Sequence, residues 1–309
     1  MQSHQRILAV IDPTSDNQKA LYRAIELSGK TGASVTALLV IYDFSYEMTT
    51  MLSADERDLM RKSVINEKQA WLDELLTGCG QAAAQLHGKV VWHNRPYEAV
   101  IKEVLNNNHE IVVKATHEHN QFKAVIFTPT DWHLLRKCPV PLLLVKEHEW
   151  PCDSKVLAAV HASSDDSEHI SLNHKIIKEA VAMADVLGSK PVLANCYPSA
   201  AVNLAVEIPE FDPVTYTEAI AKHHQDELDN YSSRYKIPED DAIIQEGLAE
   251  DVIPLLAKQL DAELVVLGTV GRTGISAALI GNTAEHMLDQ LNCDVLALKP
   301  DGFVCPVDK

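Results

Sequence analysis

The chain has 309 residues, of which 46% are hydrophobic and 23% charged, so it is long enough for about two globular domains with buried cores. Its formal net charge of −17 argues against nonspecific binding to nucleic acid or to an anionic membrane surface. The N-terminal apolar run is too short for a signal peptide, and no apolar stretch reaches the roughly 18 residues of a membrane helix, so a cytoplasmic location is expected.

Alternating strand and helix patterns run through the first half of the chain. Short apolar runs predict buried strands, and apolar residues at helical spacing predict amphipathic helices between them. In chain order the predicted strands are 7–11, 35–41, 89–93, 111–114 and 142–146, and the predicted helices are 17–28, 54–76 and 97–105. This alternation indicates a parallel sheet covered by helices on both faces, which is a doubly wound α/β fold.

The second half repeats the pattern as an internal duplication. RILAVI at 6–11 resembles KVLAAV at 155–160, and EIVVKAT at 110–116 resembles ELVVLGT, which lies 153 residues further on. The predicted strands here are 156–160, 191–196, 242–245, 264–267 and 295–298, and the predicted helices are 171–187, 216–235, 250–260 and 283–291. We therefore expect two α/β domains, at 1–147 and 155–309, joined by a linker at 148–154.

A glycine-rich loop follows the fourth predicted strand of the second half. Its glycines are Gly268, Gly271, Gly274 and Gly281. Glycines let backbone N–H groups approach an anion, and a helix N-terminus adds unbonded N–H groups and a favourable dipole. The loop therefore predicts a phosphate site, although it matches neither a Walker loop nor Gly-x-Gly-x-x-Gly. The alternative is a loop of turn glycines that ends in a helix capped by Asn282.

Together these segments resemble the universal stress protein family, twice and over nearly the whole chain. The resemblance is carried by RILAVIDPTSDNQKALYRAIELS at 6–28 and by Gly-x2-Gly-x9-Gly-Asn-Thr at 268–283, the spacing of the family's ATP-binding branch. It implies five-stranded sheets of order 3-2-1-4-5 and a small-molecule ligand, ATP with Mg²⁺. It also implies that the two domains form an intramolecular pseudo-dimer through their last strands.

The resemblance also implies where the ligand binds. Its phosphate loop falls on Gly268, Thr269, Gly271, Gly281, Asn282 and Thr283, and Arg272 within that loop is a further candidate phosphate contact. Its adenosine-side pocket falls on Ala159, Val160, His161, Asn195 and Cys196. The family usually has an acidic residue after its first strand. The first domain keeps it as Asp12, whereas the second has His161 there.

The first domain lacks the features of the phosphate loop. The positions of the three signature glycines and the following asparagine hold Ala115, Glu118, Thr128 and Pro129. Glu118 adds negative charge and Pro129 removes an N–H donor. We therefore expect only the second domain to bind ATP.

Other polar groups favour structural roles. The alternating His117-Glu118-His119 lacks the spacing of an HExxH zinc site, and the six cysteines show no zinc-type spacing, so no metal site is predicted. Lys114 and Lys146 at strand ends, and the pair 223–224 on a charged helix, are expected to be solvated. No nucleophile elbow or pair of catalytic carboxylates is evident, which argues against an enzyme.

Three functional hypotheses follow. The first is a cytoplasmic stress-response protein whose second domain binds ATP or a related phosphorylated ligand and signals by a conformational change, with unidentified protein partners. The second is a binder of a partly apolar, non-nucleotide small molecule that uses His161 and the apolar segment 197–216, matched by segment 44–52 in the first domain. The third is a weak ATP hydrolase, for which the sequence offers no base.

Overall fold

The computed structural model describes residues 5–45, 53–80, 86–118, 125–146, 150–151, 153–199, 212–269 and 281–308. The chain divides into two compact units. Unit 1 is Met1–Lys146 with Val304–Lys309, and unit 2 is Glu147–Phe303. Each unit is an α/β domain, as the alternating pattern predicted. The expected pairing of the units within the chain stays a prediction.

Unit 1 is built around a five-stranded parallel sheet. Its strands are β1 (Arg6–Val10), β2 (Ser34–Ile41), β3 (Leu86–Trp92), β4 (Ile111–Ala115) and β7 (Leu142–Val145). Its helices are α1 (Lys19–Thr31), α3 (Ala54–Gly78), α4 (Pro96–Asn107) and α5 (Pro129–Lys137). The strand order is β3-β2-β1-β4-β7, and all pairings are parallel. This is the 3-2-1-4-5 order that the resemblance implied. A short antiparallel hairpin, β5 (His117–Glu118) with β6 (Val125–Ile126), was not predicted.

Unit 2 repeats this architecture. Its strands are β8 (Lys155–Val160), β9 (Lys190–Tyr197), β10 (Ala242–Glu246), β11 (Ala262–Gly268) and β12 (Asp294–Leu298). Its helices are α6 (Ser167–Leu187), α8 (Pro213–Tyr235), α9 (Ala249–Gln259) and α10 (Asn282–Gln290), with a 3-10 turn, η2 (Glu239–Asp241). The order β10-β9-β8-β11-β12 is again 3-2-1-4-5, with parallel pairing throughout.

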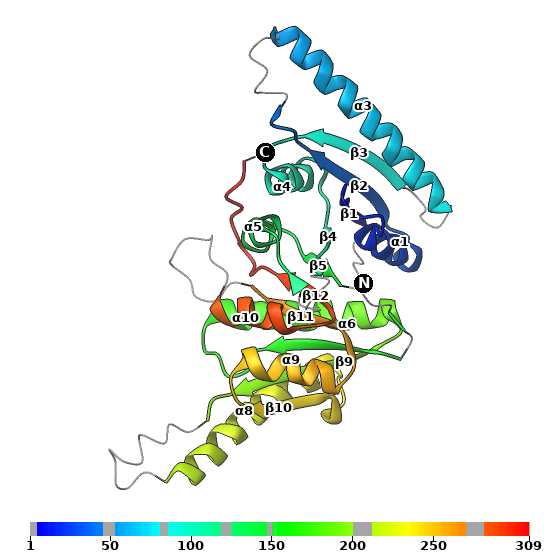
Figure 1. The fold of residues 1–309 in the computed structure, drawn as a ribbon. Helices are drawn as coiled ribbons and strands as arrows, with labels where there is room; N and C mark the ends of the chain where they lie inside the picture. Colours follow the sequence, from blue (N-terminus) through cyan, green and yellow to red (C-terminus); the bar gives the residue numbers. More distant parts are fainter. Residues whose placement is uncertain are drawn as a thin grey trace. The chain divides into compact units, whose positions relative to one another are not determined.

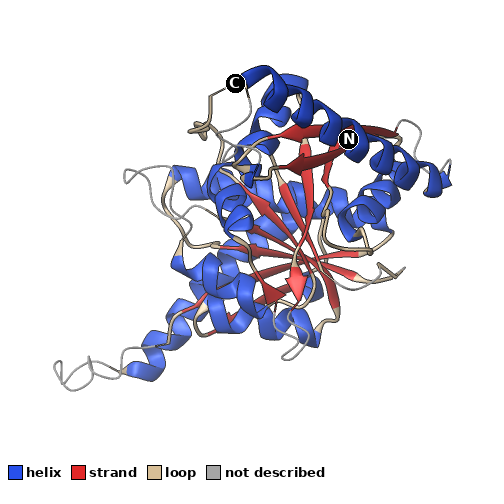
Figure 2. Ribbon diagram, turned by 45° about the horizontal axis from the view of Figure 1, so that its top comes forward, coloured by secondary structure: helices blue, strands red, loops and turns tan. Residues whose placement is uncertain are grey.

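Helices cover both faces of each sheet, because right-handed crossovers change face where the strand order reverses. In unit 1, α1 and α3 lie on one face, and α4 and α5 on the other (Figure 1). Figure 2 shows strands in red between helices in blue. Consecutive apolar residues are buried in the central strands, as at Ile111–Val113 of β4 and Leu264–Leu267 of β11, because helices cover both faces. No helix in the described ranges is long and apolar enough to cross a membrane.

The turn after the first strand is held in the same way in both units. In unit 1, the Asp12 N–H donates to Gln18 Oε1 at 3.1 Å, and Gln18 Nε2 donates to the Asp12 carbonyl at 2.6 Å. In unit 2, Asn173 makes the same two bonds to the backbone of His161, at 3.1 and 2.8 Å. Asp12 and His161 therefore occupy equivalent places, each fixed by an amide side chain.

Candidate functional site

A cavity of about 420 Å³ opens in unit 2 at the carboxyl ends of β8 and β11. The strand order reverses between these two strands, and doubly wound sheets bind their ligands at such a point. Helices from both faces of the sheet contribute to the lining. The size falls in the range of small-molecule sites, which is roughly 300–1,000 Å³.

Most of the predicted site residues that the structure describes line this cavity. They are Ala159, Val160, His161, Cys196, Gly268, Thr269, Gly281 and Thr283. Asn195 does not: it is fully buried, and its side chain accepts a hydrogen bond from the Ala162 N–H in the loop after β8. Gly271, Arg272 and the side chain of Asn282 lie outside the described residues, as does most of the apolar segment 197–216 and of its counterpart at 44–52.

Two groups of lining residues were missed by the sequence analysis. One is the turn between β10 and α9, with Gly247, Leu248 and Glu250. The other is the first part of α6, which includes His169 and Leu172. Gly247 has φ +132°, a backbone conformation that favours glycine. A glycine at the carboxyl end of a predicted strand was the one available signal for the first group.

The first turn of α10 faces the cavity through Thr283 and Ala284. Gly281 is the N-cap, with φ −63° and ψ 139°, and no described side chain caps this helix. The alternative interpretation, a helix capped by Asn282, is therefore wrong, because Asn282 is already the first helical residue. A helix start without a side-chain cap leaves N–H groups free to bind a ligand, and the helix dipole favours an anion there.

The mouth of the glycine loop is closed by hydrogen bonds. The Gly281 N–H donates to the Thr269 carbonyl at 3.3 Å, so the loop returns to the residue that it leaves from. The Thr269 hydroxyl donates to the Leu298 carbonyl at 3.2 Å and accepts from Lys299 Nζ at 2.8 Å. Both Thr269 and Lys299 are buried. The Thr269 hydroxyl is thus bonded to Leu298 and Lys299 at the end of β12, and these bonds fix the position of Thr269 at the start of the loop.

The first glycine of the motif also has a packing role. A Cβ on Gly268 would lie 2.6 Å from Leu172 Cδ2 and 3.6 Å from Ile176 Cδ1 on α6. The Ile176 distance is an ordinary contact, but at 2.6 Å the Leu172 methyl group would have to move, so glycine lets α6 pack in this position against the end of β11. This position has a structural reason for glycine besides any contact with a ligand.

Unit 1 fills the equivalent place with a buried ion pair. At the spacing of 153 residues, Lys114 and Asp131 replace the cavity-lining Leu267 and Ala284. Lys114 Nζ lies 2.6 Å from Asp131 Oδ1, and the Asp131 side chain is fully buried. Both residues are buried, so the expectation that Lys114 is solvated is wrong. The same holds for Lys146, which is 2% exposed.

The start of α5 is also capped, unlike the start of α10. Thr128 and Asp131 form a capping box: Asp131 Oδ2 accepts from the Thr128 N–H at 2.6 Å, and the Asp131 N–H donates to Thr128 Oγ1 at 3.3 Å. Pro129 supplies no N–H at all. The donors that α10 presents to its cavity are therefore used or missing in α5, which fits the expectation that the first domain does not bind a phosphate in this way.

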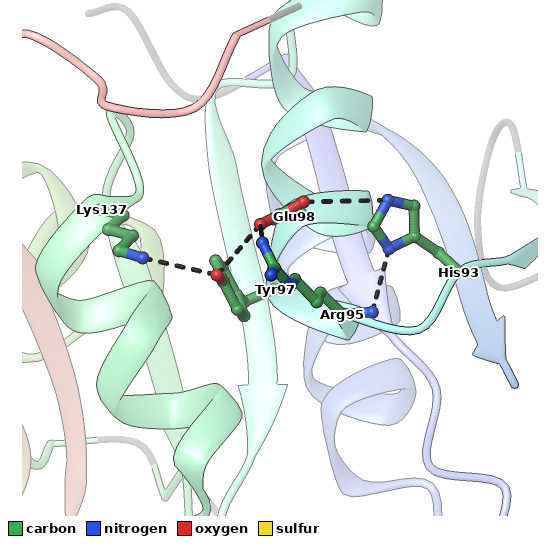
Figure 3. Close-up of polar contacts among 5 residues, drawn as sticks. All are labelled: His93, Arg95, Tyr97, Glu98 and Lys137. Atoms are coloured by element: carbon green, nitrogen blue, oxygen red, sulfur yellow. Dashed lines mark hydrogen bonds and ion pairs between the residues drawn. The ribbon is translucent and has the colours of Figure 1, made fainter. Parts of the chain in front are cut away.

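In unit 1, Tyr97 occupies the position that the cavity-lining Glu250 has in unit 2. Its hydroxyl donates to Glu98 Oε1 at 3.1 Å and accepts from Lys137 Nζ at 3.5 Å, while Arg95 pairs with the same Glu98 oxygen at 2.8 Å (Figure 3). The His133 ring stacks on Tyr97 with centroids 4.1 Å apart. A polar and aromatic cluster thus joins α4 to α5 where unit 2 has its cavity.

Two ionisable groups of the unit 2 cavity, His161 and Cys196, have pKa values shifted towards their neutral forms. Burial by surrounding atoms, and then the neighbouring His169, lower the pKa of His161. Burial, with a smaller contribution from the Glu250 charge, raises the pKa of the Cys196 thiol to about 11. Cys196 is therefore an unreactive thiol at neutral pH. Among the described lining residues no Lys or Arg is present, so an anion would be met by N–H groups and imidazoles.

A hydrogen-bonded chain of Asn195, His224 and Ser163 lies beside the cavity. Asn195 Oδ1 accepts from the Ala162 N–H at 3.0 Å, which turns Asn195 Nδ2 towards His224 Nδ1 at 2.7 Å. His224 Nδ1 must then accept, so the ring proton lies on Nε2 and donates to Ser163 Oγ at 3.1 Å. Although the trio resembles a catalytic triad, the direction of donation is the opposite of the one that would activate a serine.

His224 is 6% exposed, so the expectation that it is solvated is wrong. Burial is the main cause that lowers its pKa, with the charges of His223 and His161 adding to it. Protonation would also put a proton on Nδ1, facing the Asn195 amide donor. The folded state therefore favours the neutral ring.

Unit 2 is expected to lose stability as the pH falls below about 6.5, the ordinary pKa of histidine. His224 has a lowered pKa in the folded state, so the unfolded chain binds the proton more readily. The contribution of neutral His224 to the free energy of unfolding is therefore complete above that pH and is lost as the pH falls. His161 and His174, also with lowered pKa, act in the same direction. Urea unfolding followed across this range should give a shallower pH slope for His224→Gln than for wild type, and an unchanged slope for the exposed His286→Gln.

Comparisons with known proteins agree with this fold. The Universal stress protein family model matches residues 3–146 and 165–299. Universal stress protein E of Escherichia coli K12 is 48% identical over 309 residues, covering 100% of this chain and 98% of the relative. The Universal stress protein E homolog of Haemophilus influenzae is 39% identical, covering 96% and 97%. A functionally unknown protein from Pseudomonas aeruginosa PAO1 has a solved structure with TM-score 0.74 and 30% identity, covering 98% of this chain and 95% of that one.

Fold and site define a tandem α/β protein with a cavity of about 420 Å³ in its second unit. The family match covers both units. The chain belongs to the universal stress protein family, and its full-length likeness is to the tandem E type.

Proposed function

We propose that unit 2 binds ATP with Mg²⁺, or a related phosphorylated ligand, and that the protein acts in the stress response of the cytoplasm by binding and conformational signalling. The phosphates lie at the start of α10, near Gly281 and Thr283, and the nucleoside lies towards Ala159 and Cys196. The observation that carries the proposal is the uncapped start of α10 at the cavity, set against the capped and proline-blocked start of α5.

The proposed role is binding, because the chemistry of turnover is missing from the described part of the site. The carboxylate in the described lining is Glu250, and the neutral Cys196 thiol is a poor nucleophile. The Ser163 hydroxyl accepts a hydrogen bond from His224 Nε2 and is not activated by it. Weak hydrolysis of ATP is a lesser alternative. A phosphate-release assay that gives no rate above buffer would remove it.

Isothermal calorimetry with ATP and Mg²⁺ tests the proposal directly. We expect one binding site per chain and a heat signal that disappears when adenosine replaces ATP, because the phosphates supply the main contacts. Gly271→Glu, which places the unit 1 residue in the loop, should abolish binding. Absence of binding to the wild-type protein would contradict the proposal.

A second candidate is a partly apolar small molecule, favoured by the aliphatic lining of the cavity. Val160, Leu172, Ile253, Leu267 and Met287 all face it. Such a lining can bury hydrocarbon at about 25 cal/mol per Å². Native mass spectrometry of the purified protein separates the two candidates: a copurified apolar mass supports the second, and a nucleotide mass supports the first.

A further inference from the structure

The residue after β8 differs in chemistry from its counterpart in unit 1, although its backbone is held identically. In unit 1 the Asp12 carboxylate is used within its own turn, where Oδ1 accepts from Thr14 N at 2.9 Å and from Thr14 Oγ1 at 2.7 Å. In unit 2 the His161 side chain faces the cavity. A carboxylate can only accept hydrogen bonds, whereas an imidazole can donate one and can carry positive charge.

A second imidazole accompanies His161 at the cavity. The ring of His169, in the first turn of α6, lies 6.0 Å away, centroid to centroid, at an interplanar angle of 69°. Both rings line the cavity. His169 Nδ1 lies 3.4 Å from Asp166 Oδ2, which leaves its Nε2 available. The β8 side of the cavity therefore carries two adjacent groups that bind anions when protonated.

We propose that His161 and His169 form a second anion subsite in the unit 2 cavity, so that the preferred ligand is a nucleotide with an additional phosphate on its ribose. This inference rests on the proposed function, in which the other phosphate lies at α10. In dinucleotide-binding folds an acidic residue at the ribose accepts bonds from its hydroxyls, and a cationic residue accommodates a ribose phosphate. His161 stands where unit 1 has Asp12, so a side chain that accepts hydrogen bonds is replaced by one that can donate them.

Binding at this subsite takes up protons. The empty cavity favours neutral His161, and a bound anion would favour the charged form. The groups that face or adjoin it are His169 from α6, Asp166 at the N-cap of α6, His224 from α8, Cys196 from β9 and Glu250 from α9. Cys196 is neutral, and Asp166 and Glu250 oppose an anion, so the imidazoles must supply the attraction. The affinity for the ribose-phosphorylated ligand should therefore rise as the pH falls.

The test is calorimetry with AMP, adenosine 3′,5′-bisphosphate and adenosine 2′,5′-bisphosphate at about pH 6 and about pH 8. At the lower pH we expect at least one bisphosphate to bind roughly 10-fold tighter than AMP, consistent with one added charged hydrogen bond. At the higher pH this difference in affinity should be smaller. His161→Asp should reverse the preference. His87→Asp, the same change at an exposed position on β3 of unit 1, should leave it intact.

The outcomes separate the two proposals. If AMP and both bisphosphates bind equally to the wild type at both pH values, the second subsite is wrong while the proposed function stands. If His161→Asp keeps the wild-type preference, the subsite is also wrong. If none of these nucleotides binds while ATP with Mg²⁺ does, the second subsite is wrong and the proposed function stands; if ATP with Mg²⁺ also fails to bind, both proposals are overturned.

Discussion

Replacing Asp131 by alanine is expected to lower the free energy of unfolding of unit 1 by roughly 3–5 kcal/mol, the cost of breaking a buried ion pair. The Asp131 side chain is fully buried, 2.6 Å from Lys114 Nζ, and it also accepts the Thr128 N–H and hydroxyl at 2.6 and 2.8 Å. Its loss leaves a buried ammonium ion and removes the cap of α5. Hydrogen–deuterium exchange of α5, with urea unfolding of the whole chain, measures the effect on this unit.

Unit 2 shows how the same position can be filled without charge. The double variant Lys114→Leu with Asp131→Ala copies Leu267 and Ala284. Because no charge is then left buried, the double variant should regain much of the stability that either single variant loses. Arg95→Ala is the matched control: Arg95 pairs with Glu98 at 2.8 Å, and the two side chains are 62% and 21% exposed, so its loss should change the free energy of unfolding far less. Additive losses in the double variant would contradict this account.

The fold was predictable from the sequence because it depends on local patterns that recur. Apolar runs such as Leu264–Leu267 mark the strands, and apolar residues at helical spacing mark the helices. Because the domain is duplicated, most elements are predicted independently in each half of the chain. The helix α5 and the β5–β6 hairpin were less accessible. The hairpin strands have two residues each, too short for any periodicity to appear.

The site was predictable where it depends on one continuous segment, and not where distant segments meet. The glycine positions and the strand ends pointed to the cavity, whereas Glu250 and His169 reach it only through the packing of α9 and α6. The predictions for buried polar residues were wrong for the same reason. Lys114 and His224 look solvated in sequence, since their partners Asp131 and Asn195 lie 17 and 29 residues away along the chain.

The strongest effect on function is expected when the unit 1 arrangement is transferred to unit 2. The triple variant Leu267→Lys, Gly281→Thr and Ala284→Asp copies Lys114, Thr128 and Asp131 at equivalent positions. It should fold, because unit 1 shows that this ion pair and capping box fit the same elements, and the Gly281 backbone, at φ −63° and ψ 139°, is close to that of Thr128, at −75° and 161°.

This triple variant should bind ATP at least about 100-fold more weakly than wild type. The new cap occupies first-turn N–H groups of α10, and hydrogen bonds to a charged group contribute about 1.5–3 kcal/mol each. The new carboxylate also stands where the phosphate would lie. Calorimetry with ATP and Mg²⁺ measures the loss, and circular dichroism melting checks that the fold is kept. His286→Asp, an added carboxylate at an exposed position on the same helix, should bind like wild type. Undiminished binding by a folded triple variant would place the phosphates away from the start of α10.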